Sequence, residues 1–247
     1  MRHRQFIACL LLAPGLALAS VGQPAQYSVD QQPYEGYFVT PAPDAPLVLL
    51  LHDWDGLTEY ETRRADMLAS QGYAVFAADL FGQGKRPTTV EDKRAHTGEL
   101  YQNREKLRAL MQGALRAARG LGADTRRAVA MGYCFGGAAV LELARSGADL
   151  EGFATFHGGL GTPEGQNYDR AKGAYLIQHG TADSHISMAQ FAALAEALEA
   201  AGLPHSMTTY GGAPHAFTVF GQDSYRADAD QQSWDAFLTF LEQRLAR

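Results

Sequence analysis

A cysteine lies in a glycine-rich turn between an expected strand and an expected helix. Residues 127–144 read RAVAMGYCFGGAAVLELA, so Gly132, Cys134 and Gly136 form a G-x-C-x-G pattern. This pattern is typical of a nucleophile elbow, a turn that exposes a reactive side chain and leaves no room for side chains close on either side. The helix behind Cys134 directs free N–H groups at the sulfur, which favours a thiolate and a developing oxyanion. The alternative is a small core cysteine, since free cysteine is often buried.

Two further side chains follow expected strands and supply what a thiol nucleophile needs. Asp183 ends the segment HGTAD after the strand at 174–178, and His215 lies in GGAPHAF after the strand at 206–210. A nucleophile needs a base, and the base needs a group that orients it. The order nucleophile, acid, histidine matches hydrolases built on alternating strands and helices. We therefore predict a catalytic triad of Cys134, His215 and Asp183.

A metal site is a weaker alternative near the same strand ends. It could be assembled from six side chains: His52, Asp53, Asp55, His179, Asp183 and His185. Neither a helical H-x-x-x-H pair nor a cysteine pair supports it. The sequence also lacks a Walker A motif and a G-x-G-x-x-G after the first strand, so we expect no metal and no cofactor. His179 is expected to be structural and His205 to lie on the surface, while His96 and His185 have no informative context.

Short apolar runs alternate with helical patterns, and these elements must bring the three side chains together. Apolar runs such as LVLLL at 47–51 predict strands buried on both faces. The expected strands cover residues 47–51, 73–78, 128–131, 153–156, 174–178 and 206–210. The expected helices cover residues 58–71, 91–120, 138–145 and 187–202, followed by a terminal helix that includes 234–245. This alternation predicts an α/β fold with a mostly parallel central sheet and helices on both faces.

The first residues are expected to be a secretory signal peptide. Arg2 and Arg4 precede an almost wholly apolar stretch at 6–19, which ends in the small-x-small signal ALA. Cleavage before Ser20 removes residues 1–19 and leaves 20–247 as a single α/β domain of an exported protein, periplasmic or secreted. An uncleaved anchor is the alternative, but a membrane span needs roughly 20 apolar residues. We therefore expect no stable membrane anchor after cleavage.

Charge and cysteine content narrow the possible partners. The chain of 247 residues has a net charge of −6, and removal of the signal leaves 19 basic against 27 acidic residues. This acidic balance argues against a nucleic-acid partner. Cys134 is then the single cysteine, which excludes a disulfide framework. An unpaired thiol in an oxidising compartment is a liability unless it is buried or used.

Five segments together resemble one known family. They are HDWDGL at 52–57, GYCFGGAAVLELARSGADL at 132–150, FHGGL at 156–160, HGTAD at 179–183 and YGGAPHAF at 210–217. They resemble the dienelactone hydrolase family over nearly the whole mature chain. The resemblance implies an α/β-hydrolase fold with Cys134 as nucleophile, His215 as base and later acid, and Asp183 orienting His215.

The resemblance also implies roles around the triad and two departures. The family's oxyanion donors are backbone N–H groups, which match Phe135 and Trp54 here. A family glutamate beside the thiol governs its ionisation, and the matching residue is Asp53, one methylene shorter. Dienelactone hydrolases proper bind their substrate's carboxylate with arginines, one of them four residues after the histidine. Val219 stands there, so dienelactone itself is not indicated as substrate.

The leading hypothesis is a cofactor-free cysteine hydrolase of small carboxylic esters or lactones that forms an acyl-enzyme on Cys134. A broader acyl hydrolase, such as a thioesterase or peptidase, is one alternative. A non-catalytic thiol module for redox chemistry or ligand binding is the other alternative, and Asp53 and Asp55 are the residues that keep it open. The oligomeric state, the identity of the substrate and a lid role for residues 83–97 stay open at this point.

Overall fold

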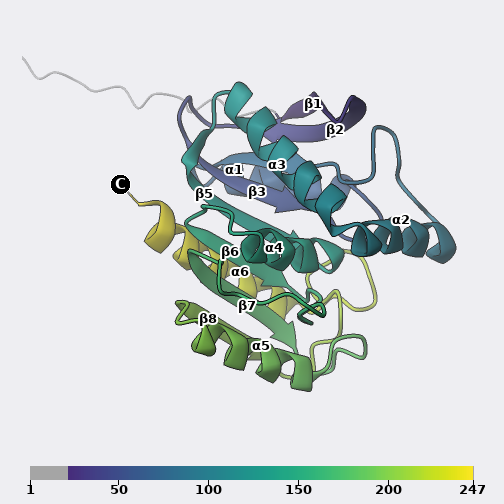
Figure 1. Ribbon diagram of the computed structural model, residues 1–247, viewed down its shortest axis with the longest axis vertical. Helices are drawn as coiled ribbons and strands as arrows, with labels where there is room; N and C mark the ends of the chain where they lie inside the picture. The colour runs from purple at the N-terminus through teal and green to yellow at the C-terminus, as the bar shows by residue number, and fades with distance from the viewer. Residues whose placement is uncertain (1–21, 247) are drawn as a thin grey trace, which may run out of the picture.

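The computed structural model describes residues 22–246, so the predicted signal peptide at 1–19 lies outside the described residues. A single sheet of eight strands forms the centre (Figure 1). Its strands are β1 (Gln23–Val29), β2 (Gln32–Val39), β3 (Pro46–Leu51), β4 (Ala74–Ala78), β5 (Asp124–Tyr133), β6 (Gly152–Phe156), β7 (Ala174–Gly180) and β8 (His205–Tyr210). Their order across the sheet is β1-β2-β4-β3-β5-β6-β7-β8.

Pairing within the sheet confirms the predicted fold class. The six strands from β3 to β8 pair in parallel, whereas β2 pairs antiparallel with both β1 and β4. The β1–β2 hairpin is absent from the predicted elements, because its strands mix polar and apolar residues and are only half buried. Parallel strands present their carboxyl ends at one edge of the sheet. The loops after β3, β5, β6, β7 and β8 therefore meet at the same edge.

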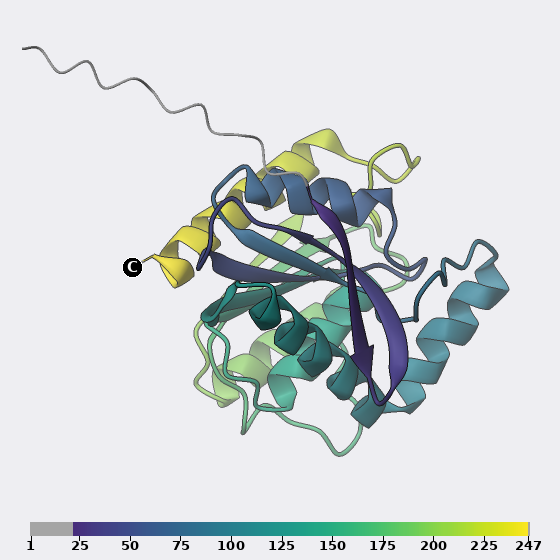
Figure 2. The same ribbon diagram turned by 90° about the horizontal axis from the view of Figure 1, so that it is seen from above.

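Helices cover both faces of the sheet, as predicted. α1 (Glu59–Ala69) and α6 (Ala227–Leu245) pack on one face, and α3 (Arg104–Gly120), α4 (Phe135–Arg145) and α5 (Met188–Ala200) on the other (Figure 2). α2 (Val90–Gln102) lies outside these two layers. None of the helices described within 22–246 is both long and apolar enough to span a bilayer.

The single helix predicted at 91–120 is wrong. The structure has two helices, α2 and α3, with Asn103 between them at φ −113° and ψ 77°. The Asn103 side chain accepts the Lys106 N–H at 3.0 Å and so caps the start of α3. Asparagine favours helix starts because its side chain satisfies an N–H that has no partner within the helix. The break lets α3 cover the sheet while α2 turns away from it.

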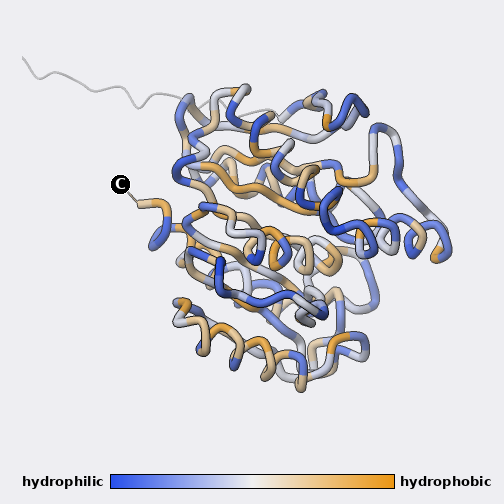
Figure 3. Tube along the Cα trace, viewed as in Figure 1, coloured by the Kyte–Doolittle hydropathy of each residue, from blue (hydrophilic) through white to orange (hydrophobic). Residues whose placement is uncertain are grey.

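The central strands form the core between the two helical layers. All five residues at 47–51 are fully buried, and Figure 3 shows the hydrophobic colour concentrated along the central strands. Burial of such side chains contributes on the order of 1.5–3 kcal/mol each. This rigid sheet fixes the positions of the loops at its carboxyl edge.

Candidate active site

Cys134 lies at the sharp turn between β5 and α4. Its backbone has φ 50° and ψ −111°, a conformation that a residue with a side chain adopts only under strain. Glycine is required on both sides. A Cβ at Gly132 would overlap the Gly136 backbone, and a Cβ at Gly136 would overlap the carbonyl of Leu51. The geometry is that of the predicted nucleophile elbow.

Asp183 and His215 come together from the loops after β7 and β8. The Nδ1 atom of His215 lies 2.7 Å from Oδ2 of Asp183. The other carboxylate oxygen of Asp183 accepts the N–H groups of His185 at 2.8 Å and Ile186 at 2.9 Å. Burial raises the pKa of Asp183, but these hydrogen bonds outweigh it and lower the pKa to about 2. The carboxylate is thus ionised and fixed against the imidazole.

One cavity joins Cys134 and His215, and Asp183 contacts His215 from outside its lining. It has a volume of about 400 Å³, and its walls include Cys134 and His215. The remaining lining residues are Asp53, Trp54, Thr97, Tyr101, Phe135, Gly159, His185, Ile186, Ala216, Gln222 and Ser224. Among the described residues, no hydrogen bond joins the Cys134 sulfur to His215. Such contacts are often long in a free enzyme and shorten when substrate binds.

The surroundings of Cys134 favour the neutral thiol, contrary to the expectation that the helix start favours a thiolate. Burial raises the pKa of Cys134 well above its usual value, the charge of Asp53 raises it further, and the Phe135 N–H opposes the shift. Desolvation and a nearby like charge both disfavour an anion. A neutral thiol needs a base to become a nucleophile, which makes the imidazole of His215 important.

Asp53 and the two expected oxyanion donors lie beside Cys134. Asp53 is buried and lines the same cavity. Within residues 22–246, however, no hydrogen bond links its carboxyl group to the thiol of Cys134. Burial raises the pKa of Asp53 well above its usual value, and the neighbouring Asp55 and Glu61 add to this. The Trp54 N–H donates to the Asp53 carboxylate, so that donor is occupied in the structure. The Phe135 N–H, in the first turn of α4, points toward the sulfur.

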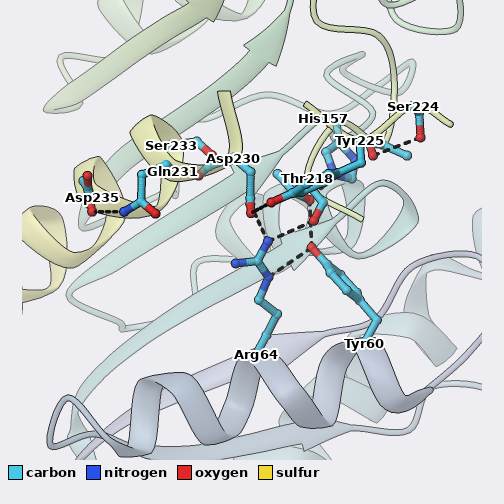
Figure 4. A network of polar contacts seen from close by, with 11 residues as sticks. Tyr60, Arg64, His157, Thr218, Ser224, Tyr225, Asp230, Gln231, Ser233 and Asp235 are labelled. Carbon is cyan, nitrogen blue, oxygen red and sulfur yellow. Dashed lines mark hydrogen bonds and ion pairs between the residues drawn. The ribbon is translucent and has the colours of Figure 1, made fainter. Parts of the chain in front are cut away.

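A network of polar contacts joins α1, α6 and the loop that follows β8 (Figure 4). Arg64 of α1 forms an ion pair with Asp230 of α6 and donates to the carbonyl of Thr218 at 2.9 Å. The Thr218 hydroxyl in turn contacts Tyr60 Oη at 2.7 Å and His157 Nε2 at 2.8 Å. Thr218 lies in the same loop as His215, so the network fixes that loop to both helices on one face of the sheet.

His157 and His185 are site residues that sequence reasoning missed. The rings of His157 and His185 pack edge-on to the His215 ring, with centroids 5.3 Å and 5.1 Å away. Burial lowers the pKa of His157 well below its usual value, and the adjacent His215 lowers it further. His157 has φ 41°. It belongs to the FHGGL segment, one of the five segments that resemble the family, and this segment could have identified it as a site residue from the sequence.

The remaining candidates have ordinary roles. The buried His179 stacks on Phe191 with centroids 5.5 Å apart, in keeping with its predicted structural role. The prediction that His205 lies on the surface is wrong, because its side chain in β8 is mostly covered and its Nε2 atom lies 3.5 Å from Glu199. No group of three or more side chains within 22–246 is arranged to hold a metal ion. Part of the segment 83–97 borders the cavity through Thr97, and Lys93 contacts Asp55 at 3.4 Å.

Comparison with known proteins identifies the family. The model of the dienelactone hydrolase family matches residues 34–245. The chain belongs to the dienelactone hydrolase family. This family membership makes the protein a carboxylic ester hydrolase with an α/β-hydrolase fold.

An individual relative and two solved structures support the assignment to this family. A Yersinia pestis protein named "Putative carboxymethylenebutenolidase" is 24% identical over 209 residues, 80% of this chain and 78% of that protein. The solved structure named m3DLH has 30% identity and a TM-score of 0.85, and covers 92% of this chain and 100% of its own. The dienelactone hydrolase-like promiscuous phosphotriesterase P91, from metagenomic libraries, has 28% identity and a TM-score of 0.86 with the same coverage.

Proposed function

We propose that this dienelactone hydrolase family member hydrolyses small carboxylic esters or lactones through an acyl-enzyme on Cys134. The observation that carries the proposal is the shared cavity: a strained cysteine elbow and a histidine bonded to a fixed carboxylate open onto the same space. Nucleophile, base and orienting acid are the parts that acyl transfer needs.

The proposed reaction has two steps. Cys134 Sγ attacks the ester carbonyl carbon while its proton passes to Nε2 of His215, the ring nitrogen not bonded to Asp183. The tetrahedral intermediate collapses with cleavage of the carbon–oxygen bond to the alcohol, and the imidazolium returns its proton to the leaving alkoxide. His215 then activates a water molecule, which attacks the thioester and releases the acid and the free thiol.

The backbone N–H groups of Phe135 and Trp54 are proposed to stabilise the oxyanion. The Trp54 N–H is held by the Asp53 carboxylate in the free protein, so Asp53 has to release this donor when the oxyanion forms. Burial is the main reason that the pKa of the thiol is raised, and an ionised Asp53 raises it further. We propose that Asp53 modulates the thiol through its charge rather than through direct contact.

A non-catalytic redox module fits the site less well. Redox-sensing cysteines have low pKa values and are accessible, whereas burial raises the pKa of Cys134. A thioesterase or peptidase activity would use the same groups, and a panel of matched ester, thioester and amide substrates separates these possibilities.

We also propose that residues 20–247 form the single domain of the exported protein after cleavage between residues 19 and 20. N-terminal sequencing of the secreted form tests this proposal.

Turnover of p-nitrophenyl acetate by residues 20–247 tests the catalytic proposal. Multiple turnover is expected in the wild type and is expected to vanish in Cys134→Ala. Cys134→Ser serves as a control for a hydroxyl at the same position, and labelling with iodoacetamide reports whether the wild-type thiol is accessible. Turnover that survives in Cys134→Ala would contradict the assignment of the nucleophile.

A further inference from the structure

A group of three arginines surrounds one carboxylate next to the active-site cavity. Glu142 of α4 is fully buried, and Arg104, Arg108 and Arg145 lie within 4 Å of its oxygens. One negative charge is thus matched against three positive charges. The cluster therefore has two positive charges in excess, and only two of its arginines hydrogen-bond to the carboxylate.

Arg108 and Arg145 are the arginines that Glu142 satisfies. Arg108 Nε donates to one carboxylate oxygen of Glu142 at 2.7 Å, and Arg145 Nη2 donates to the other at 3.1 Å. Arg145 has further partners in Gln166 at 2.7 Å and Tyr168 at 2.9 Å. The guanidinium groups of Arg108 and Arg145 therefore have hydrogen-bond partners within the protein and stabilise the buried Glu142.

Arg104 is the arginine left over. Its nearest carboxylate oxygen, on Glu142, is 3.6 Å away, and within residues 22–246 its side chain donates no hydrogen bond. The guanidinium lies over the Tyr101 ring, 4.8 Å from the centroid, and its side chain keeps a quarter of its surface exposed. Burial and the two neighbouring arginines lower the pKa of Arg104 against the effects of Glu142 and Tyr101. A cation in this position is open to an anionic ligand.

Arg104 faces a pocket that adjoins the active-site cavity. This pocket of about 250 Å³ is lined by Tyr101, Arg104, Ala138, Arg145, Gly159 and Gly161. Tyr101 and Gly159 also line the cavity that holds Cys134. The Tyr101 ring packs on Phe135 with centroids 5.3 Å apart and supports Arg104 by its own contact. The two spaces thus share Tyr101 and Gly159 in their walls.

We propose that the pocket at Arg104 binds an anionic group, a carboxylate or a phosphate, at the far end of the substrate's acyl chain. The inference rests on the proposed function, because it requires the ester carbonyl to lie at Cys134. The guanidinium has the donor geometry to bind either anion with two hydrogen bonds. The substrate class is then a half-ester of a dicarboxylic acid or an ester with a terminal phosphate, rather than a simple alkyl ester.

The preference for an anionic chain tests this proposal. The probes are the mono-p-nitrophenyl esters of adipic and suberic acids, their methyl-capped neutral analogues, and a p-nitrophenyl ester with a terminal phosphonate. In the wild type, the better of the anionic probes is expected to have a higher kcat/KM than its neutral analogue. Arg104→Gln is expected to lower that kcat/KM by roughly 10- to 100-fold, because a hydrogen bond to a charged group is lost. The loss should lie in KM, since the contact is remote from the bond that breaks.

Two matched variants control the experiment. Arg108→Gln removes the same charge from the same cluster and the same helix but does not line the pocket. It is expected to leave the anionic preference within about twofold, since screening weakens charges that do not contact the ligand. Arg104→Lys keeps the charge and is expected to retain part of the preference. The ratio between carboxylate and phosphonate probes identifies the anion.

The outcomes separate this proposal from the one on which it rests. A wild type that hydrolyses neutral and anionic esters equally, or an Arg104→Gln variant that keeps the full preference, would overturn the anion site alone. An anionic preference lost equally in Arg108→Gln would overturn it as well, by indicating a general field effect. Hydrolysis of the neutral esters that persists in Cys134→Ala would instead overturn the proposed function.

Discussion

Asp183→Asn is expected to abolish most activity, and the structure gives the reason. One oxygen of Asp183 is held by the N–H groups of His185 and Ile186, and the other faces Nδ1 of His215. In the asparagine variant, the two N–H donors fix the amide oxygen at the first position. The amide NH₂ then faces His215, whose Nδ1 must become an acceptor.

The proton of His215 then lies on Nε2, the nitrogen that should accept the thiol proton. The same substitution in a serine-protease triad lowers kcat by about 10⁴-fold, and a cysteine with a raised pKa depends on its base in the same way. We expect kcat for p-nitrophenyl acetate to fall by about 10³- to 10⁴-fold. Asp183→Ala imposes no tautomer and is expected to retain more activity than Asp183→Asn. A folded Asp183→Asn variant with more than about a tenth of wild-type kcat would refute this reasoning.

The same variant has a consequence for stability. The pKa of Asp183 is lowered to about 2, so its ionised form stabilises the folded state by roughly 2 kcal/mol above its unfolded pKa of about 3.9. Because the folded pKa is depressed, this contribution is lost as the pH falls from about 4 to about 2. Urea unfolding of wild type and Asp183→Asn at neutral pH and at low pH is expected to show a difference that shrinks in acid.

Three further results are expected. Arg64→Met leaves Asp230 without its buried partner and should lower the free energy of unfolding in urea by about 3–5 kcal/mol, whereas a loss under about 1 kcal/mol would contradict a strong ion pair. Alkylation of Cys134 by iodoacetamide should be slow at neutral pH and accelerate in alkali, because burial raises its pKa; a flat rate profile would argue against a neutral thiol. Gly132→Ala should remove activity because its methyl group overlaps the elbow backbone, while Gly98→Ala, with open space around it, should not.

The local parts of the site were predictable from the sequence. The elbow depends on glycines within two residues of Cys134, and the overlaps at Gly132 and Gly136 explain why the motif is specific. Asp183 and His215 were found because each follows an apolar strand, and strand ends converge in a parallel sheet. These features depend on local pattern and on the topology that the pattern implies.

The parts that sequence reasoning missed depend on distant contacts. The ionisation of Cys134 depends on burial and on Asp53, which lies in the loop after another strand. The position of Cys134 at a helix start was therefore not enough to predict the protonation of its thiol. The network from Arg64 to His157 joins residues 93 positions apart through Thr218. The break at Asn103 was hidden because both flanking segments have helical patterns.

Direct detection of the acyl-enzyme tests the central claim of this account. Wild-type protein mixed with p-nitrophenyl acetate and quenched in acid before turnover is complete should show a mass increase of one acetyl group. After digestion, this acetyl group is expected on the peptide that contains Cys134, as a thioester that hydroxylamine removes. Cys134→Ala should show no such adduct. Rapid hydrolysis by the wild type with acetylation at another residue would contradict Cys134 as the nucleophile.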